Sequence, residues 1–243
     1  MELSVLAIAG LASGMLNVVA GGGSFIILPL LLFLGLPATV ANATNRVGVV
    51  AQTIGSLWGF HQHGSLDWRW ALRATAPAVA GAAIGVWAAL YTPDIAFRRI
   101  LSIAMVAVTL WSLLRPRAPL VTSTTPVPAS NPWIVGSFFV VGLYAGFIQA
   151  GVGFLVLAIT TTAGMDLLRG NAVKVLSVLV LTGLSLAAFA ATGHVDWPRG
   201  LALGAGNLVG GVIGVRLAVA MGHAWLERLV TVAVVIFAFA LWL

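Results

Sequence analysis

Long stretches without one charged residue constrain the fold of this chain more than any other feature of its sequence. Residues 3–45 contain no Asp, Glu, Lys or Arg, and neither do residues 118–165. A helix needs about 20 mainly apolar residues to cross the roughly 30 Å hydrocarbon core of a bilayer. The sequence therefore predicts an all-α, polytopic membrane protein. Shorter uncharged stretches cover residues 47–66, 74–93, 100–114, 175–195, 200–215 and 229–243.

The composition excludes several other classes of protein. Only 7% of the residues are charged, against about a quarter in soluble domains, which rules out a soluble enzyme, a nucleic-acid-binding protein and a disordered chain. The 12 bases and 6 acids lie mostly near predicted helix ends, where Lys and Arg orient membrane segments. Without cysteine there is no thiolate nucleophile or zinc–thiolate site. We expect no metal, no cofactor and no nucleic-acid partner.

The chain also contains an internal duplication with a spacing of 129 residues. Gly81 and Gly85 fall on Gly210 and Gly214 at this spacing, and many other positions match in the same way. A stretch rich in Pro, Ser and Thr, which cannot continue a helix, separates the copies. The predicted organisation is a first membrane repeat at 1–115, a linker at 116–132 and a second membrane repeat at 133–243.

Each copy contains four apolar segments, and the first segment is the longest. About 32 residues at 1.5 Å rise make a helix near 48 Å, well beyond the membrane core, so this segment must bend or break. Glycines that permit non-helical backbone angles mark the place, at Gly21-Gly22-Gly23 and at Gly151-Val152-Gly153. The expected segments are 3–34, 38–60, 68–90 and 95–114, then 133–163, 169–192, 197–221 and 224–242.

Two arrangements of the copies remain open. If both first segments cross the membrane, the copies are parallel and the bases divide about evenly between the two faces. If both fold back as re-entrant hairpins, the second copy is inverted and the bases divide eight to three, which fits the positive-inside rule. Charge favours inverted repeats with both termini outside. The eight are Arg69, Arg73, Arg115, Arg117, Arg169, Lys174, Arg216 and Arg228, and the three are Arg98, Arg99 and Arg199.

The two glycine breaks are candidate binding positions. Non-helical backbone inside a membrane is tolerated where it is buried or lines a wet cavity, and the unpaired N–H groups of a helix start attract anions. Ser24 follows the first break and is placed either to cap the second half-helix or to contact a ligand. The alternative is close helix packing, which we expect of Gly81-xxx-Gly85 and Gly210-xxx-Gly214. The candidates are Gly21, Gly22, Gly23, Ser24, Gly151 and Gly153.

Polar residues near the breaks complete the candidate site. Cations inside a membrane are costly and mark function by default, although a long side chain near a helix end also reaches the headgroups by snorkelling. Every acid falls at a predicted helix end or loop, so we expect no buried carboxylate to carry protons. The further candidates are Asn17 and Gln149 before the breaks, and Thr44, Asn45, Arg46 and Lys174 at the start of the following segments.

The segment GLASGMLNVVAGGGSFIILPLLLFLGLPATVANATN resembles the opening of the TauE/SafE sulfite-exporter family, also called the toluene-sulfonate uptake permease family. The second copy, GLYAGFIQAGVGFLVLAITTTAGMDLLRGNAVK, keeps the glycines but has no counterpart of Pro29, and Val173 replaces Thr44. The resemblance covers essentially the whole chain. The matching residues in the first copy are Gly21, Gly22, Gly23, Pro29, Gly35, Leu36, Pro37, Ala41 and Thr44.

The resemblance implies a secondary transporter of small organosulfur or organic anions, such as sulfite, sulfonates or sulfoacetate. We predict a multi-pass protein of the bacterial cytoplasmic (inner) membrane that exports its substrate, has the lipid bilayer as its surroundings, and is not an enzyme. An anion-selective channel and a carboxylate uptake permease are the alternatives, and a homodimer is compatible with the sequence.

Overall fold

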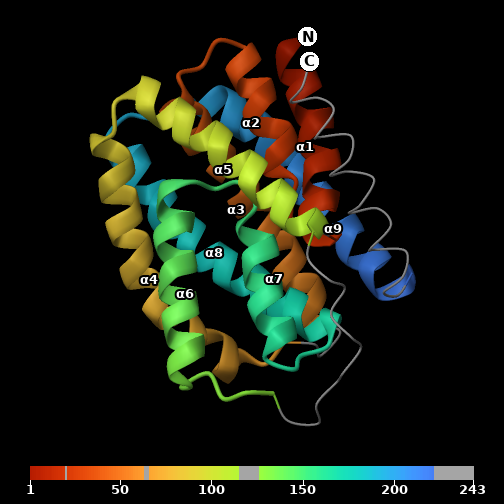
Figure 1. The fold of residues 1–243 in the computed structure, drawn as a ribbon. Helices are drawn as coiled ribbons and strands as arrows, with labels where there is room; N and C mark the ends of the chain where they lie inside the picture. Colours follow the sequence, from red (N-terminus) through yellow and green to blue (C-terminus); the bar gives the residue numbers. More distant parts are fainter. Residues whose placement is uncertain (20, 63–65, 115–125, 222–243) are drawn as a thin grey trace.

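The computed structural model describes residues 1–19, 21–62, 66–114 and 126–221. These residues form helices joined by short turns and contain no β-strand (Figure 1). The expected last segment at 224–242 and most of the linker lie outside the described residues. In chain order the helices are α1 (Glu2–Val19), α2 (Ser24–Phe33), α3 (Ala38–Gln62), α4 (Trp68–Tyr91), α5 (Asp94–Leu114), α6 (Pro132–Phe147), α7 (Val152–Thr162), α8 (Leu167–Ala191) and α9 (Trp197–Met221).

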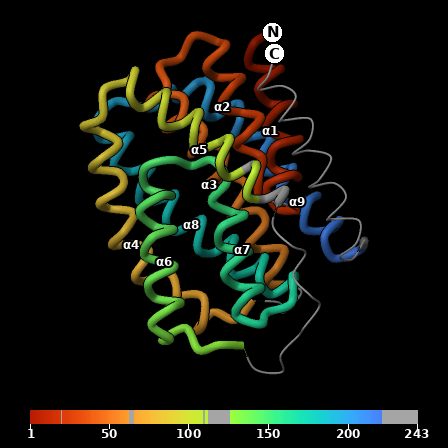
Figure 2. The backbone as a smooth tube through the Cα atoms, viewed as in Figure 1, coloured from red at the N-terminus to blue at the C-terminus, as the bar shows by residue number. Residues whose placement is uncertain are grey.

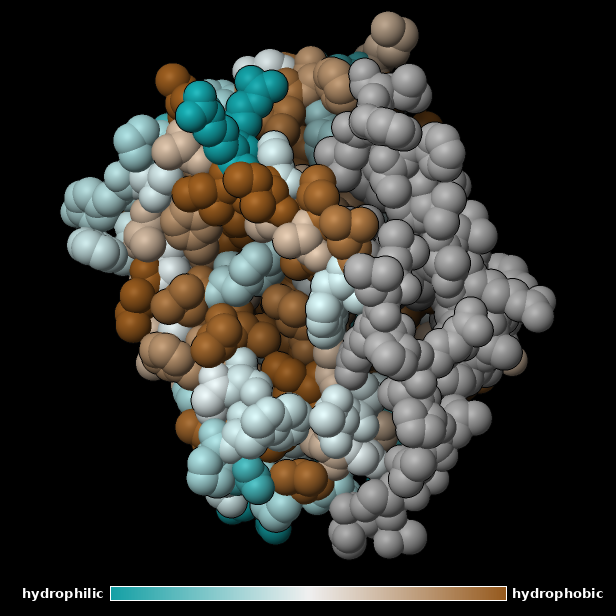
Figure 3. All heavy atoms as spheres, in the orientation of Figure 1, coloured by the Kyte–Doolittle hydropathy of each residue, from teal (hydrophilic) through white to brown (hydrophobic). Residues whose placement is uncertain are grey.

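The surface of the bundle is apolar where a membrane would surround it. Four of the described helices, α1, α4, α8 and α9, are long and apolar enough to span a bilayer. Large apolar side chains such as Trp58, Trp87 and Ile103 are more than half exposed. Brown hydrophobic residues cross the middle of the visible face, and the strongest teal lies toward its upper and lower ends (Figure 3). The protein is a multi-pass membrane protein.

The first segment of each expected repeat is divided into two helices. Residues 21–23 lie between α1 and α2, and residues 148–151 lie between α6 and α7. Within these breaks Gly21 and Gly151 have φ angles of +87° and +73°, which glycine adopts without the strain that a Cβ would add. The predicted interruption of both long segments at their glycines therefore matches the observed backbone, except that Val152 and Gly153 of the second motif already belong to the first turn of α7.

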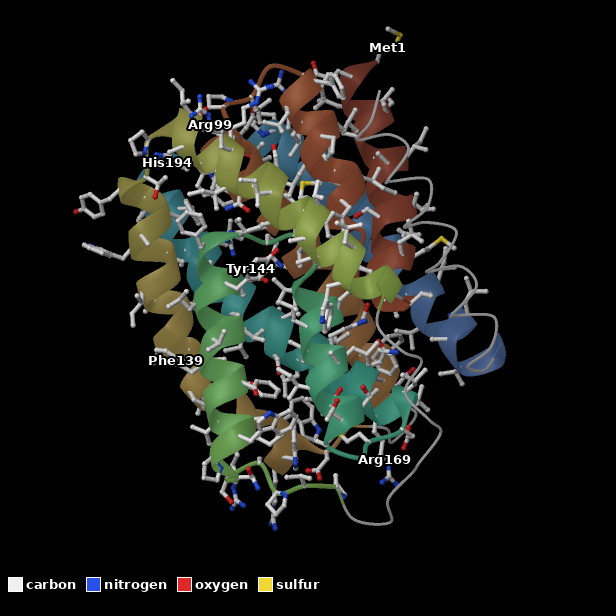
Figure 4. All side chains as sticks on the ribbon, viewed as in Figure 1. Met1, Arg99, Phe139, Tyr144, Arg169 and His194 are labelled. Carbon is white, nitrogen blue, oxygen red and sulfur yellow. The ribbon has the colours of Figure 1, made fainter. Side chains whose placement is uncertain are left out.

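The divided segments enter the bundle from opposite ends. Met1, Arg99 and His194 mark the upper end, and Arg169 marks the lower end (Figure 4). α1 descends from the upper end to mid-height and α2 returns upward, whereas α6 rises from the lower end and α7 returns downward (Figure 2). A hydrogen bond from the Val127 N–H to the Ala163 carbonyl, 2.8 Å long, holds the outer ends of the second pair together.

Glycines bring two pairs of helices into backbone contact. A Cβ added at Gly81 of α4 would collide with the Phe139 carbonyl of α6, and one added at Gly142 would collide with the Ala78 carbonyl. Gly210 of α9 meets the backbone of α1 in the same way. Small residues allow this close approach between membrane helices, so the predicted packing role of these glycines is confirmed.

Helix α3 lies inside the bundle and carries polar residues that water would normally surround. All of its residues from Ala41 to Val49 are buried, and the helix contacts α2, α5, α8 and α9. Buried polar groups need hydrogen-bond partners to offset their desolvation. Those partners lie at the two helix breaks, and they define the candidate site.

Candidate functional site

The two helix breaks touch each other in the interior of the protein. A Cβ built on Gly21 would lie 2.7 Å from the Cα of Gly153, and one built on Gly153 would lie 2.6 Å from the Cα of Gly21. Only glycine leaves room for this contact. Gly22 faces the ring of Phe154, and Gly23 faces the Ser13 carbonyl, so the first break is packed on both sides.

A small polar cavity adjoins this contact. The space open to the centres of water molecules is about 20 Å³, which is room for roughly one or two waters. Apolar side chains from α3 and α8 form one part of its wall, and Gly21 and Gly153 form another. The polar side chains that line it are Asn17, Ser24, Gln52, Thr53, Gln149 and Lys174.

Lys174 of α8 holds the end of α1. Its ammonium nitrogen donates to the Asn17 carbonyl at 2.9 Å and to the Val18 carbonyl at 2.8 Å. These carbonyls belong to the last turn of α1, where a helix carries partial negative charge. The side chain is only 2% exposed, so its charge lies inside the bundle, and the snorkelling alternative does not describe it.

Arg46 of α3 does the same for the end of α6. Its guanidinium donates to the Ala145 carbonyl at 3.0 Å, the Gly146 carbonyl at 2.8 Å and the Gln149 side-chain oxygen at 2.9 Å. The guanidinium carbon also lies 5.1 Å from the centre of the Phe189 ring, within cation–π range. Arg46 is buried but does not line the cavity. Each buried cation thus holds the broken helix of the other half of the chain.

The amide side chains of Asn17 and Gln149 have defined orientations. The Gly23 N–H donates to Oδ1 of Asn17 at 2.8 Å. Arg46 and the Thr182 hydroxyl, at 3.2 Å, both donate to Oε1 of Gln149. Since a backbone N–H and a guanidinium can only donate, the contacted atoms must be oxygens. Both residues line the cavity, so their NH₂ groups are the ends left for it.

The remaining predicted residues divide between the cavity wall and its support. Ser24 lines the cavity, and its oxygen accepts from the Asn45 amide at 3.0 Å, whereas the N-cap residue of α2 is Gly23 without a side-chain cap. Thr44 accepts from the Asp196 N–H at 3.0 Å, near the upper end. Gly151 packs against Val108 and Phe25 outside the cavity wall.

Three contributors were not among the predicted site residues. Gln52 and Thr53 line the cavity from α3, both about two turns beyond Asn45, and this i, i+7, i+8 spacing on one helix face is a signal that could have found them. Tyr144, at mid-height in Figure 4, donates to the Ala150 carbonyl at 2.7 Å and so holds the second break. Within the described residues, no three His, Asp or Glu side chains gather where a metal ion could bind.

The sequence profile of the family described as "Sulfite exporter TauE/SafE" matches residues 6–241, nearly the whole chain. The chain belongs to the TauE/SafE family. Curated relatives of this TauE/SafE protein carry transporter names. It is 26% identical to "Probable membrane transporter protein ORF9" of Sinorhizobium sp over 242 residues, which cover 95% of this chain and 88% of that protein.

Two further relatives of this TauE/SafE protein cover similar lengths. It is 24% identical over 232 residues to a "Probable membrane transporter protein" of Haemophilus influenzae, covering 95% of this chain and 90% of the relative. It is 25% identical over 232 residues to "Probable membrane transporter protein YfcA" of Escherichia coli K12, covering 95% and 86%. No solved structure matches the chain. The protein is therefore a membrane transporter of the TauE/SafE type.

Proposed function

We propose that this protein is a secondary transporter, not an enzyme, that moves a small anion through the cavity where the two helix breaks meet. The observation that carries the proposal is the charge of that cavity. Lys174 is the one charged residue among the described residues that line it, and no carboxylate does so. A cavity with a buried cation and no counter-charge favours an anion over a neutral or cationic ligand.

Lys174 has bonding capacity left for a substrate. An ammonium group has three donors, and the carbonyls of Asn17 and Val18 use two of them. The third donor is available to a ligand in the cavity. A hydrogen bond between two charged partners is shorter and stronger than a neutral one, so this contact would supply a large part of the affinity.

The small volume of the cavity fits a carrier in a closed conformation. Space for one or two waters does not admit an anion of four or more heavy atoms in this conformation. We infer that the structure represents a closed state, from which helix movement opens the cavity to one side of the membrane at a time. At the contact between Gly21 and Gly153 there is not even room for a Cβ.

We also propose that the two halves are inverted repeats, with 1–115 and 133–243 joined by the linker at 116–132. Three features support this. Gly35 follows the C-terminal end of α2 with a φ of +85°, and Gly164, 129 residues later, follows the C-terminal end of α7 with a φ of +92°. α1 packs on α9 while α6 packs on α4, and at a spacing of 129 residues these two pairs are counterparts. The helix pairs α1–α2 and α6–α7 enter from opposite ends (Figure 2).

Labelling tests this topology. Arg169 is exposed at the lower end (Figure 4), and Pro37 is exposed in the turn after α2, the helix that returns upward (Figure 2). The chain has no cysteine of its own. Single Pro37→Cys and Arg169→Cys variants should behave oppositely with a membrane-impermeant maleimide in intact cells. The charge split of the sequence favours a cytoplasmic lower end under the positive-inside rule, although Lys174, counted in the group of eight, lies inside the bundle and not at that end. We therefore expect Pro37→Cys to react and Arg169→Cys not to react. Equal labelling would restore the parallel arrangement.

The substrate class rests on the family and on the site together. The family description names sulfite export. The cation Lys174 and the NH₂ groups of Asn17 and Gln149 in the cavity wall fit compact oxyanions such as sulfite, sulfonates and sulfoacetate, whereas the NH₂ group of Gln52 is bound to Ser56. The relatives come from bacteria, which supports placement in a bacterial inner membrane. Uptake of a small carboxylate is the second candidate, because a carboxylate offers the same acceptor oxygens.

Counterflow in proteoliposomes tests the transport proposal. Vesicles preloaded with unlabelled sulfite, sulfoacetate, methanesulfonate or lactate should accelerate uptake of the labelled anion that the carrier accepts. Lys174→Met should reduce this acceleration by about tenfold or more, whereas Arg69→Met, the loss of an exposed base at a helix end, should leave it intact. Uptake that preloading does not accelerate would indicate a channel.

A further inference from the structure

Each half of the chain contributes an amide side chain to the cavity wall. The residue types alone do not decide whether each amide offers the cavity a donor or an acceptor. Asn17 and Gln149 each carry one acceptor and two donors, so either end of the amide could face a ligand. Which end does so is set by the neighbours of each amide. These side chains are 8% and 3% exposed, so bulk water cannot satisfy or reorient them.

The framework fixes the two amides in the same sense. At the first break, the Gly23 N–H donates a hydrogen bond to Oδ1 of Asn17. At the second break, Arg46 and Thr182 both donate to Oε1 of Gln149. No partner within the described part of the chain takes the NH₂ group of either residue, and neither nitrogen is among the fully enclosed atoms that lack a partner. Both NH₂ groups therefore face the cavity beside Lys174.

Arg46 is the residue that makes this orientation necessary at the second break. Its NH1 group bridges the Ala145 carbonyl and Gln149, and its NH2 group binds the Gly146 carbonyl. The guanidinium is thereby fixed at the end of α6 and cannot turn away from Gln149. If the amide of Gln149 were reversed, its NH₂ group would face the donors of Arg46, which is an unfavourable contact.

We propose that Arg46 is a positioning residue for anion recognition: it turns the NH₂ group of Gln149 into the cavity, where it joins the NH₂ group of Asn17 and the ammonium of Lys174 in binding the substrate. This assignment rests on the proposed anion transport. With this orientation, hydrogen-bond donors from both breaks face the cavity. A substrate with several acceptor oxygens is then bound by both halves of the protein at once. A ligand with a single acceptor atom is disfavoured.

The competing view is that Arg46 only stabilises the C-terminal end of α6. That role needs its bonds to the two carbonyls and makes no demand on the orientation of Gln149. Gln149→Glu keeps an oxygen for Arg46 and replaces the inward NH₂ group by a second, negatively charged oxygen, so it tests whether this end of the side chain meets the anion. Folding should be kept or strengthened, because Arg46 pairs well with a carboxylate. The two views differ for Arg46→Lys: a purely stabilising role predicts a lower unfolding midpoint with unchanged anion affinity, whereas a positioning role predicts weaker anion binding.

The test measures sulfite and methanesulfonate binding to the purified full-length protein by calorimetry, together with the heat-unfolding midpoint. Gln149→Glu should raise the Kd by about a hundredfold or more, because like charges then meet in the cavity, while the unfolding midpoint stays the same or rises. Asn17→Asp, which keeps the oxygen for Gly23, should also weaken binding by about tenfold or more. Gln62→Glu, the same change at an exposed position of α3, is the matched control and should change neither.

Arg46→Lys separates positioning from charge. Lysine keeps the cation but loses the fixed fork that holds Gln149, so the KM for transport should rise by about tenfold while the maximal rate changes less. Binding by Gln149→Glu within twofold of the unaltered protein would overturn the assignment. Failure of the unaltered protein to bind any of the sulfur oxyanions or lactate would instead overturn the proposed function.

Discussion

The contact between the two helix breaks can be tested with three glycine-to-alanine substitutions. Gly21→Ala adds a Cβ where the backbone has a φ of +87° and where Gly153 lies 2.6 Å away. Gly35→Ala adds a Cβ at nearly the same φ, +85°, but with open space around it. Gly153→Ala adds a Cβ 2.6 Å from Gly21 without a positive φ. The two controls therefore separate backbone strain from overlap.

The expected destabilisation follows from these distances. A left-handed conformation costs an L-residue roughly 1–2 kcal/mol, which is all that Gly35→Ala should lose. An approach of 2.6 Å is well inside the 3.4 Å at which ordinary contact begins, and overpacking of this kind costs typically about 1–3 kcal/mol. Gly153→Ala should show this cost, reduced by up to about 1 kcal/mol because alanine favours a helix. Gly21→Ala should show both, about 2–5 kcal/mol.

Heat unfolding of the detergent-solubilised variants measures the order of these losses. Gly21→Ala should have the lowest unfolding midpoint of the three, and its loss should approach the combined losses of the two controls. If Gly21→Ala unfolds at the same temperature as Gly35→Ala, the overlap is absent. The breaks would then not touch, and the cavity described between them would be wrong.

Three further outcomes are expected. Lys174→Met should lower anion transport by about tenfold or more and destabilise the protein by about 1–3 kcal/mol, since the Asn17 and Val18 carbonyls lose their partner; an unchanged unfolding midpoint would contradict the contact with α1. Gly142→Val should reduce the folded yield because it separates α4 from α6, whereas Gly136→Val, which faces open space, should not. In proteoliposomes clamped with potassium and valinomycin at symmetrical pH, flux of a monovalent anion should follow the voltage, because about 2.3 kcal/mol per charge per 100 mV supports nearly a fiftyfold gradient; flux that ignores voltage but requires a pH gradient would show proton coupling.

The features that depend on length and composition could be predicted from the sequence. A segment of about 32 apolar residues is too long for a bilayer, so an interruption was required, and glycine is the residue that permits one. The packing of α4 on α6 follows equally from small residues four positions apart. These constraints are local, so they can be recognised in the sequence without knowledge of the tertiary structure.

The partners of the buried cations could not be predicted in the same way. Lys174 binds carbonyls 156 and 157 residues away in the sequence, a contact that exists only because the second half of the chain lies across the first. Nothing in the sequence near Arg46 indicates that its guanidinium turns to α6 and away from the cavity. The spacing of the two halves is visible in the sequence, but their relative placement is not.

Helix geometry explains why three successive polar residues of α3 contact different parts of the protein. Successive residues in an α-helix point about 100° apart, so Thr44, Asn45 and Arg46 cannot face one ligand together. In the structure they contact Asp196, Ser24 and the end of α6, respectively. The cavity instead takes Gln52 and Thr53 from the face of α3 that carries Asn45.

Substrate protection of a cysteine at position 24 tests most directly whether the meeting point of the breaks is the anion site. The chain has no cysteine, Ser24 lines the cavity, and Thr192 is exposed at the end of α8 and serves as the control position. A transported anion at saturating concentration should slow the reaction of Ser24→Cys with a small thiosulfonate reagent and leave that of Thr192→Cys unchanged. If the anion is transported but gives no protection at Ser24→Cys, the substrate binds elsewhere.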